Sequence, residues 1–118
     1  MPMVMVVDDE NVLVEMVAAL IEDMGFQTIV ATNGADALAS LVDTPETPAL
    51  ILSDVMMPRM SGVELAQAIK SHPRLQGVPI VLMSAAGRPS DTQIADGFIH
   101  KPFDLDKLAT LIENYIVS

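Results

Sequence analysis

Five polar side chains stand where short apolar segments of the sequence end: Asp8, Asp9, Asp54, Ser84 and Lys101. Three carboxylates held close together repel one another, which raises the proton affinity of at least one of them unless a cation lies between them. Because every ligand in this set is an oxygen atom, a hard ion such as Mg²⁺ fits best. An aspartate beside Mg²⁺ and a lysine ammonium can attack a phosphoryl group and hold it as an acyl phosphate. Lys101 would neutralise phosphoryl oxygens, and the Ser84 hydroxyl could donate a hydrogen bond to one.

These side chains can meet if the segments before them are strands of one sheet. Continuous apolar runs predict five strands, at residues 3–7, 26–31, 48–54, 78–84 and 97–101. Amphipathic helices are predicted at residues 11–25, 33–42, 61–72 and 104–116. Apolar strands that alternate with such helices predict a parallel sheet covered on both faces, in a three-layer, doubly wound α/β domain. In such a sheet, ligands bind beyond the carboxyl ends of the strands, where the five polar side chains stand.

Helical spacing of apolar residues predicts which side of each helix faces the sheet. The expected inward residues are Leu13, Val17, Leu20 and Met24 in the first helix, Leu38, Leu41 and Val42 in the second, and Leu105, Leu108, Ile112 and Tyr115 in the last. Gly25 is the predicted stop of the first helix, and Ser61 is the predicted start of the third.

Length and composition restrict the class of protein. The chain has 118 residues, the commonest size of one domain, and residues 1–118 are expected to form a single module. Hydrophobic residues make up 51% of it, yet no apolar run reaches the ~20 residues that span a bilayer, which predicts a soluble protein without a membrane partner. The formal charge of −10 disfavours nucleic-acid binding and favours cations or proteins with basic patches as partners. The sequence has neither a cysteine nor a secretory signal, so the cytoplasm is the expected location.

Four short motifs carry a resemblance to a known family. They are "VDDE" at residues 7–10, "SDVMMPRMSG" at residues 53–62, "MSA" at residues 83–85 and "HKPF" at residues 100–103. Each motif alone is a weak signal, but four in order at suitable intervals are a strong one. Over its whole length the chain resembles the receiver domain of two-component response regulators, the CheY-like family. The resemblance implies a flavodoxin-like fold with five parallel strands in the order 2-1-3-4-5.

The family's roles, carried over by position, imply a phosphorylated aspartate and a magnesium site. Asp54 would be the residue that receives the phosphoryl group. Asp9, Asp54 and the backbone carbonyl of Met56 would hold Mg²⁺, and Asp8 would assist through water. A histidine kinase or a phosphotransfer protein would be the donor. The domain would be a signalling switch that catalyses only its own phosphorylation and dephosphorylation, not an enzyme acting on other substrates.

The resemblance also implies how the switch would reach a partner. Ser84 and Lys101 would contact the phosphoryl group, and the Lys101–Pro102 peptide bond would be cis. The added charge would draw Ser84 toward the phosphate, and Phe98 would pack into the vacated space, which changes the surface offered to a downstream protein.

Two departures from the family pattern concern the segment after the fourth strand. Between Ala86 and Phe98 lie eleven residues rich in poor helix formers, which predicts a fourth helix of at most a turn or two. The usual signalling face of the family would then lack a full-length helix. In addition, Met56 and Ala86 occupy positions where other receivers often carry polar residues that guide the hydrolytic water. Slow self-dephosphorylation is the resulting hypothesis.

Two functions from other classes stay open. A phosphohydrolase of the haloacid dehalogenase type also uses an aspartate nucleophile at a strand end with Mg²⁺. Its signature places a second aspartate two residues after the nucleophile, where this chain has Met56. The other alternative is a pseudo-receiver, a binding module with the same fold that is not phosphorylated. The presence of all five site residues argues against it.

Overall fold

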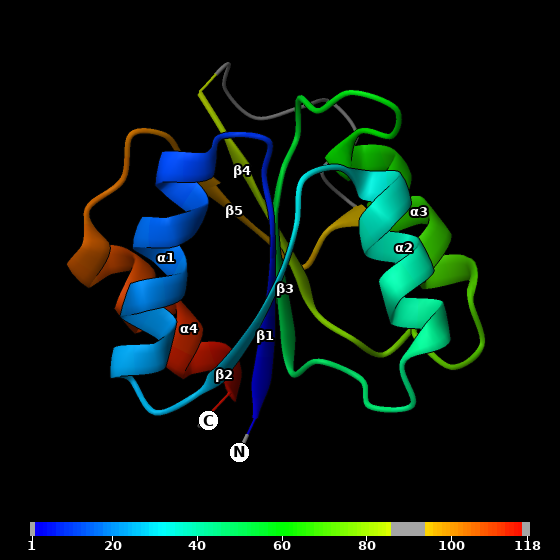
Figure 1. Cartoon of the computed structure of the whole chain (residues 1–118), viewed down its shortest axis with the longest axis horizontal. Coiled ribbons are helices and arrows are strands. Elements are labelled where there is room, and N and C mark those ends of the chain that lie inside the picture. The colour runs from blue at the N-terminus through cyan, green and yellow to red at the C-terminus, as the bar shows by residue number, and fades with distance from the viewer. Residues whose placement is uncertain (1, 86–93, 117–118) are drawn as a thin grey trace.

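The computed structural model describes residues 2–85 and 94–116 (Figure 1). Its elements are β1 (Met3–Val7), α1 (Asn11–Asp23), β2 (Gln27–Ala31), α2 (Gly34–Asp43), β3 (Leu50–Asp54), α3 (Gly62–Ser71), β4 (Ile80–Ser84), β5 (Gly97–His100) and α4 (Leu105–Ile116). The five predicted strands and the four long helices are confirmed, with bounds within two residues of those expected. The short helix predicted after Ala86 falls on residues 86–93, outside the described part. No helix in the described ranges is long and apolar enough to cross a membrane.

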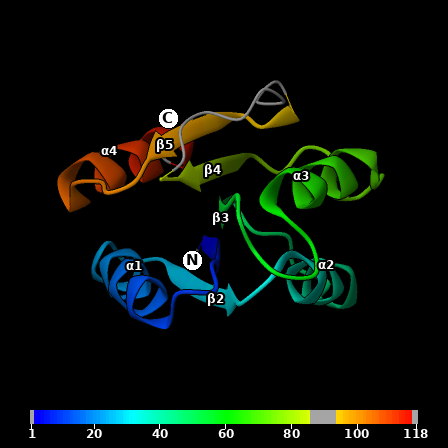
Figure 2. The same ribbon diagram turned by 90° about the horizontal axis from the view of Figure 1, so that it is seen from above.

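The five strands form one parallel sheet in the order β2-β1-β3-β4-β5. Helices α1 and α4 cover one face of the sheet, and α2 and α3 cover the other (Figures 1 and 2). The three-layer, doubly wound fold and the strand order are therefore confirmed. Because the order reverses at β1, the carboxyl ends of β1 and β3 lie side by side, where a doubly wound sheet binds ligands.

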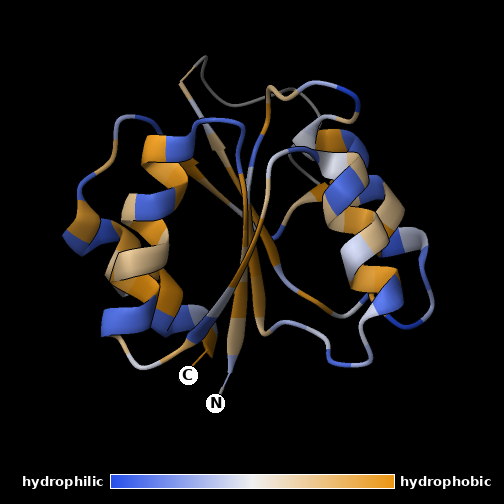
Figure 3. Ribbon diagram, in the orientation of Figure 1, coloured by the Kyte–Doolittle hydropathy of each residue, from blue (hydrophilic) through white to orange (hydrophobic). Residues whose placement is uncertain are grey.

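The central strands are apolar because helices cover them from both sides. Strands β3 and β4 are buried along their whole length, and alternate side chains of β1 point into two separate apolar clusters. One cluster lies under α2 and α3 and contains Met5 and Leu82, whereas the other lies under α1 and α4 and contains Val6 and Met83. The apolar colour in Figure 3 follows the strands and the inner sides of the helices. This buried centre positions the strand ends from which the polar side chains project.

The buried faces of the helices differ from the predicted ones at several positions. In α1 the buried stripe runs through Val14, Val17 and Ile21, and the predicted Leu13, Leu20 and Met24 flank it and are only partly buried. The prediction that Val42 and Leu105 face inward was wrong, since their exposed fractions are 47% and 37%. Val42 lies one position beyond the buried Leu41, about 100° further around the helix. Leu105 is the first residue of α4, where no preceding turn covers it.

Asp96 fastens the start of β5 to three neighbouring elements. Its carboxylate Oδ2 accepts hydrogen bonds from the Lys70 ammonium of α3 at 2.8 Å and from the Ile80 backbone N–H of β4 at 2.9 Å. Its backbone carbonyl accepts a hydrogen bond from the Tyr115 hydroxyl of α4 at 2.8 Å. This residue therefore sets the position at which β5 joins the sheet.

Replacing Ser61 with alanine is expected to reduce the free energy of unfolding by about 1 kcal/mol. Ser61 and Glu64 form a capping box, in which the Ser61 hydroxyl accepts the Glu64 N–H at 3.1 Å and the Glu64 carboxylate accepts the Ser61 N–H at 3.0 Å. Urea unfolding of Ser61→Ala measures the loss. The matched control is Ser71→Ala, at the exposed end of the same helix, which should change stability by only about 0.5 kcal/mol or less. Equal losses of unfolding free energy for Ser61→Ala and Ser71→Ala would contradict the role of Ser61 as the cap of α3.

Candidate functional site

The five predicted site residues meet at the carboxyl edge of the sheet. Asp8 and Asp9 follow β1, Asp54 ends β3, Ser84 ends β4 and Lys101 follows β5. A cleft of about 360 Å³ opens at this edge. Its lining residues are Asp9, Glu10, Asp54, Met56, Ser84, Ala85 and Lys101. Asp8 lies beneath this surface and is fully buried.

Lys101 is the cation at the centre of an acidic cluster. Its Nζ lies 2.7 Å from Oδ2 of Asp8, 3.4 Å from Oδ1 of Asp54 and 3.3 Å from Oε1 of Glu10. The Lys101 side chain is 11% exposed, so its ammonium is largely shielded from water. Pairing with buried carboxylates offsets the cost of burying this charge.

Backbone contacts fix the two buried carboxylates and the strand that carries the lysine. The Glu10 N–H donates to Oδ1 of Asp8 at 3.0 Å, and the Val55 N–H donates to Oδ1 of Asp54 at 3.0 Å. The Lys101 N–H donates to the Ser84 carbonyl at 2.9 Å and so keeps the end of β5 beside β4. The Lys101–Pro102 bond is cis, as predicted.

The electrostatics of the cluster make Asp54 an unusual carboxyl group. Burial raises the pKa of Asp54 above its ordinary value, and the neighbouring charge of Asp8 raises it further, against the opposing effect of Lys101. Burial alone would lower the pKa of Lys101, but its hydrogen bond to Asp8 and the nearby carboxylates raise it above the ordinary value. The lysine therefore stays charged, whereas the ionised form of Asp54 is held at a cost in free energy.

The donor set fits a hard divalent cation. Asp8, Asp9 and Asp54 each offer one carboxylate oxygen, and these atoms all lie within 4.8 Å of one another. Oxygen ligands of this kind suit Mg²⁺, which needs few protein ligands because it keeps several waters. Met56 also lines the cleft, and its side chain is 70% exposed. A methionine offers no side-chain oxygen, so its backbone carbonyl is the oxygen that Met56 would supply.

The remaining predicted residues lie at or near this edge. Ser84 is buried at the end of β4, beside the cleft. Phe98 lies on β5, half-buried, and packs against the apolar cluster under α2 and α3. Its register partner on β4 is Leu82, two residues before Ser84. Ala86, the second position of the dephosphorylation hypothesis, lies outside the described residues.

Comparison with known proteins gives the family. The model of the response regulator receiver domain matches residues 4–113 of this chain. The chain belongs to this family. Its members are signalling domains, and the predicted family and CheY-like fold of this receiver domain are thus confirmed.

Relatives of this receiver domain include longer proteins and isolated domains. It is 35% identical to the response regulator Rre1 of Synechocystis over 95% of its own length, and it spans only 50% of Rre1. The solved signal receiver domain of a signal transduction histidine kinase from Syntrophus aciditrophicus is 31% identical, with a TM-score of 0.89 and coverage of 99% of this chain and 91% of that one. The receiver domain of sensor histidine kinase PA1611 from Pseudomonas aeruginosa, which holds a magnesium ion in its active-site cleft, has a TM-score of 0.88 and covers 99% of this chain and 98% of that one. At 21% identity, this last likeness shows the fold alone.

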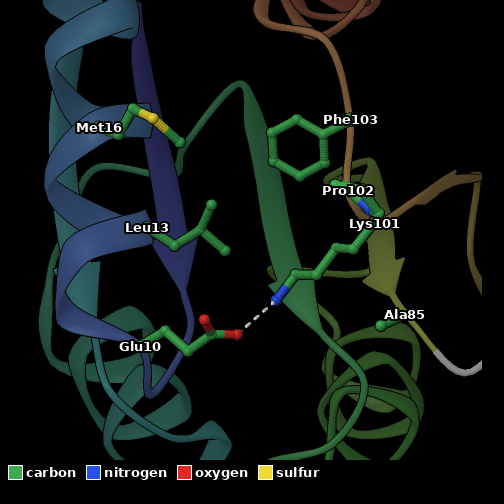
Figure 4. A pocket seen from close by; sticks show the side chains of 7 residues that line it. All are labelled: Glu10, Leu13, Met16, Ala85, Lys101, Pro102 and Phe103. Carbon is green, nitrogen blue, oxygen red and sulfur yellow. Dashed lines mark hydrogen bonds and ion pairs between the residues drawn. The ribbon is translucent and has the colours of Figure 1, made fainter.

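Sequence reasoning missed Glu10, which the receiver domain places between two cavities. Beside the acidic cleft lies a second pocket of about 280 Å³, and Glu10, Ala85 and Lys101 line both. Figure 4 shows Glu10 and Lys101 facing each other across this pocket, with apolar walls above them. These walls are Leu13, Met16, Pro102 and Phe103. The available signal was the position of Glu10 directly after the acidic pair, in the "VDDE" motif.

Two glycines allow the loop after Asp54 to lie close to the site. A Cβ atom on Gly62 would overlap the backbone carbonyl oxygen of Asp54, and the Gly62 N–H donates to the Val55 carbonyl at 2.9 Å. A Cβ atom on Gly34, at the start of α2, would lie 2.7 Å from the Met60 carbonyl oxygen. The loop after Asp54 is therefore held against Gly34 and Gly62, at positions where a side chain has no room.

Neutralising Asp54 is expected to stabilise the metal-free receiver domain by an amount that depends on pH. Because the pKa of Asp54 is raised on folding, its ionised form opposes folding at neutral pH, and this effect disappears as the pH falls through the raised value. The gain in unfolding free energy of Asp54→Asn over the wild type should thus be largest near neutral pH and should shrink as the pH falls toward about 4. Urea unfolding in EDTA at several pH values measures this difference. If the gain in unfolding free energy stayed constant over that pH range, a raised pKa of Asp54 could not be its cause.

Proposed function

We propose that this receiver domain accepts a phosphoryl group on Asp54 and acts as a two-component phosphorylation switch. The observation that carries the proposal is the position of the Asp54 carboxylate, which is buried, 3.4 Å from the Lys101 ammonium and grouped with the carboxylates of Asp8 and Asp9. Membership of the receiver family supports it. The donor would be a phosphohistidine of a histidine kinase or of a phosphotransfer protein.

In the proposed reaction, an oxygen of the Asp54 carboxylate attacks phosphorus. An oxygen–phosphorus bond forms, the nitrogen–phosphorus bond of the phosphohistidine breaks, and its electron pair returns to the imidazole nitrogen. Lys101 lies close enough to Asp54 to pair with the incoming phosphoryl oxygens. Asp8, Asp9, Asp54 and the Met56 carbonyl are the groups that would hold Mg²⁺, with Asp8 acting through water. The bound ion would supply positive charge that offsets the negative charge of the phosphoryl oxygens.

The same site supports a route from phosphorylation to a partner. The Ser84 hydroxyl would move toward the phosphoryl group, and Phe98 on the adjacent strand would occupy the space that this movement leaves. A downstream protein would read the changed surface. We propose that this occurs in the cytoplasm, without direct contact to nucleic acid or membrane, and that residues 1–118 act as one module. Slow self-dephosphorylation, expected from Met56 and Ala86, remains part of the proposal.

The two alternatives account less well for the site. A pseudo-receiver would not need the Asp54–Lys101 pair, which holds two charges in a buried place at a cost in stability. A phosphohydrolase of the haloacid dehalogenase type would need an acid two residues after the nucleophile, and this chain has Met56 there.

Incubation with acetyl phosphate tests the proposed function. The protein with Mg²⁺ is expected to gain the mass of one phosphoryl group, on the peptide that contains Asp54, and to gain none when EDTA removes the metal. Beryllofluoride with Mg²⁺ should shift the amide NMR signals of Ser84 and Phe98. No mass gain under any condition would favour the pseudo-receiver, and sustained hydrolysis of p-nitrophenyl phosphate would favour the phosphohydrolase.

A further inference from the structure

Glu10 stands at the mouth of the acidic cleft with no structural role that explains its side chain. Its backbone forms the N-cap of α1, but its side chain makes no capping hydrogen bond. The carboxylate pairs with Lys101 at 3.3 Å and is 65% exposed. Because the Glu10 side of this pair is open to water, the pair contributes little to stability. Lys101 already has a closer and fully buried partner in Asp8.

The position of Glu10 affects the approach of a phosphoryl donor to Asp54 more than it affects stability. Glu10, Ala85 and Lys101 line both the cleft and the neighbouring apolar pocket, so Glu10 lies between the two cavities. In Figure 4 its carboxylate points toward the Lys101 ammonium. Any phosphoryl donor that reaches the Asp54 carboxylate through the cleft passes close to it. The negative charge of Glu10 thus faces an incoming phosphoryl group, which is itself negative.

The formal charge of the site shows why one carboxylate counts. Asp8, Asp9, Glu10 and Asp54 against Lys101 leave a net charge of −3, which a bound Mg²⁺ would reduce to −1. Without Glu10, the loaded site would be neutral. An anionic donor is repelled by the net charge of −1 when Glu10 is present, and it meets no net charge when Glu10 is absent.

We propose that Glu10 is a specificity residue that disfavours small, highly charged phosphoryl donors relative to a phosphohistidine presented by a protein. A protein donor can offset this repulsion with contacts elsewhere on its surface, whereas a small molecule has no such contacts. The inference rests on the proposed phosphorylation of Asp54. It deepens that function by stating which class of donor the site admits.

The test compares two small donors that differ in charge. Acetyl phosphate is mainly a dianion near neutral pH, and phosphoramidate is mainly a monoanion. Phosphorylation rates are measured by intact mass at saturating Mg²⁺ and low salt for the wild type and for Glu10→Gln. The variant is expected to react about three to ten times faster with acetyl phosphate. With phosphoramidate the gain should be about the square root of that factor, because the repulsion scales with the donor's charge. Both gains should shrink at about 1 M salt, where the screening length falls to about 3 Å.

Two controls separate charge from position. Glu15→Gln removes the same charge from an exposed position on the same helix that lines neither cavity, and it should change both rates less than about twofold. Glu10→Asp keeps the charge, so its ratio of the acetyl phosphate rate to the phosphoramidate rate should stay below that of Glu10→Gln.

Three results would overturn the inference. The first is Glu10→Gln rates within twofold of the wild type for both donors. The second is equal gains for the two donors that persist in high salt, since these would indicate an altered Lys101 position instead. The third is no phosphoryl uptake by the wild type or any variant, which would overturn the proposed function as well. Uptake with unchanged rates would overturn the role of Glu10 alone.

Discussion

Replacing Asp54 with asparagine is expected to reduce phosphoryl uptake from acetyl phosphate by more than about a thousandfold. The carboxamide is isosteric with the carboxylate but is not a comparable nucleophile, so the acyl phosphate cannot form at this position. Measurement of covalent label by intact mass, with Mg²⁺ present, gives the loss directly. Since the variant also removes a buried charge whose ionisation opposes folding, its metal-free form should be at least as stable as the wild type. Loss of label in a stable variant therefore cannot be attributed to unfolding.

The matched control for this experiment is Asp23→Asn. Asp23 is an exposed carboxylate at the last position of α1, and its replacement should leave the rate of phosphoryl uptake unchanged. Full labelling of Asp54→Asn would show that another residue receives the phosphoryl group, and the proposed function of the site would have to be abandoned.

Replacing Gly62 with alanine is expected to reduce the free energy of unfolding by about 3 kcal/mol. The new Cβ would overlap the backbone carbonyl oxygen of Asp54 and would lie 3.1 Å from Cδ2 of Leu82, which is fully buried. Backbone cannot rotate out of the way as a flexible side chain can, so either β3 or the start of α3 must move. Urea unfolding measures the loss. The proposed Mg²⁺ binding, measured by calorimetry, should also be weaker in this variant than in the wild type, because Asp54 itself is displaced.

Gly77→Ala provides the comparison. Gly77 is exposed, and a Cβ atom there would have no neighbour within 4 Å. The change should leave stability the same or raise it by about 0.5 kcal/mol, through reduced freedom of the unfolded chain. If Gly62→Ala unfolded at the same urea concentration as Gly77→Ala, the close approach of α3 to Asp54 would be wrong.

The sheet and the meeting of the site residues could be predicted because both follow from simple constraints. Strands that are buried on both faces, such as β3 and β4, must be mainly apolar, and parallel strands bring their carboxyl ends to one edge. Asp54 and Lys101 could thus be placed together although forty-seven positions separate them in the sequence.

Other features depend on packing that no local pattern records. The rotation of α1 about its axis was misjudged because most of that helix is apolar, so Val14 and Leu13 fit the spacing equally well, and contact with the sheet selected Val14. The Glu10–Lys101 pair joins residues that are 91 positions apart. The place of Glu10 after the acidic pair puts it near the cleft, but no local pattern indicates that its carboxylate turns toward Lys101.

The anchoring of Asp96 has a mechanical consequence for any signal that travels through β5. Because Asp96, directly before β5, is bonded to α3, β4 and α4, the strand cannot slide as a whole without breaking contacts on three sides. The proposed movement of Ser84 would then reach the surface as a reorientation of the Phe98 ring, while β5 keeps its position. A partner protein would then have to distinguish two orientations of one aromatic ring on a surface whose backbone is otherwise unchanged.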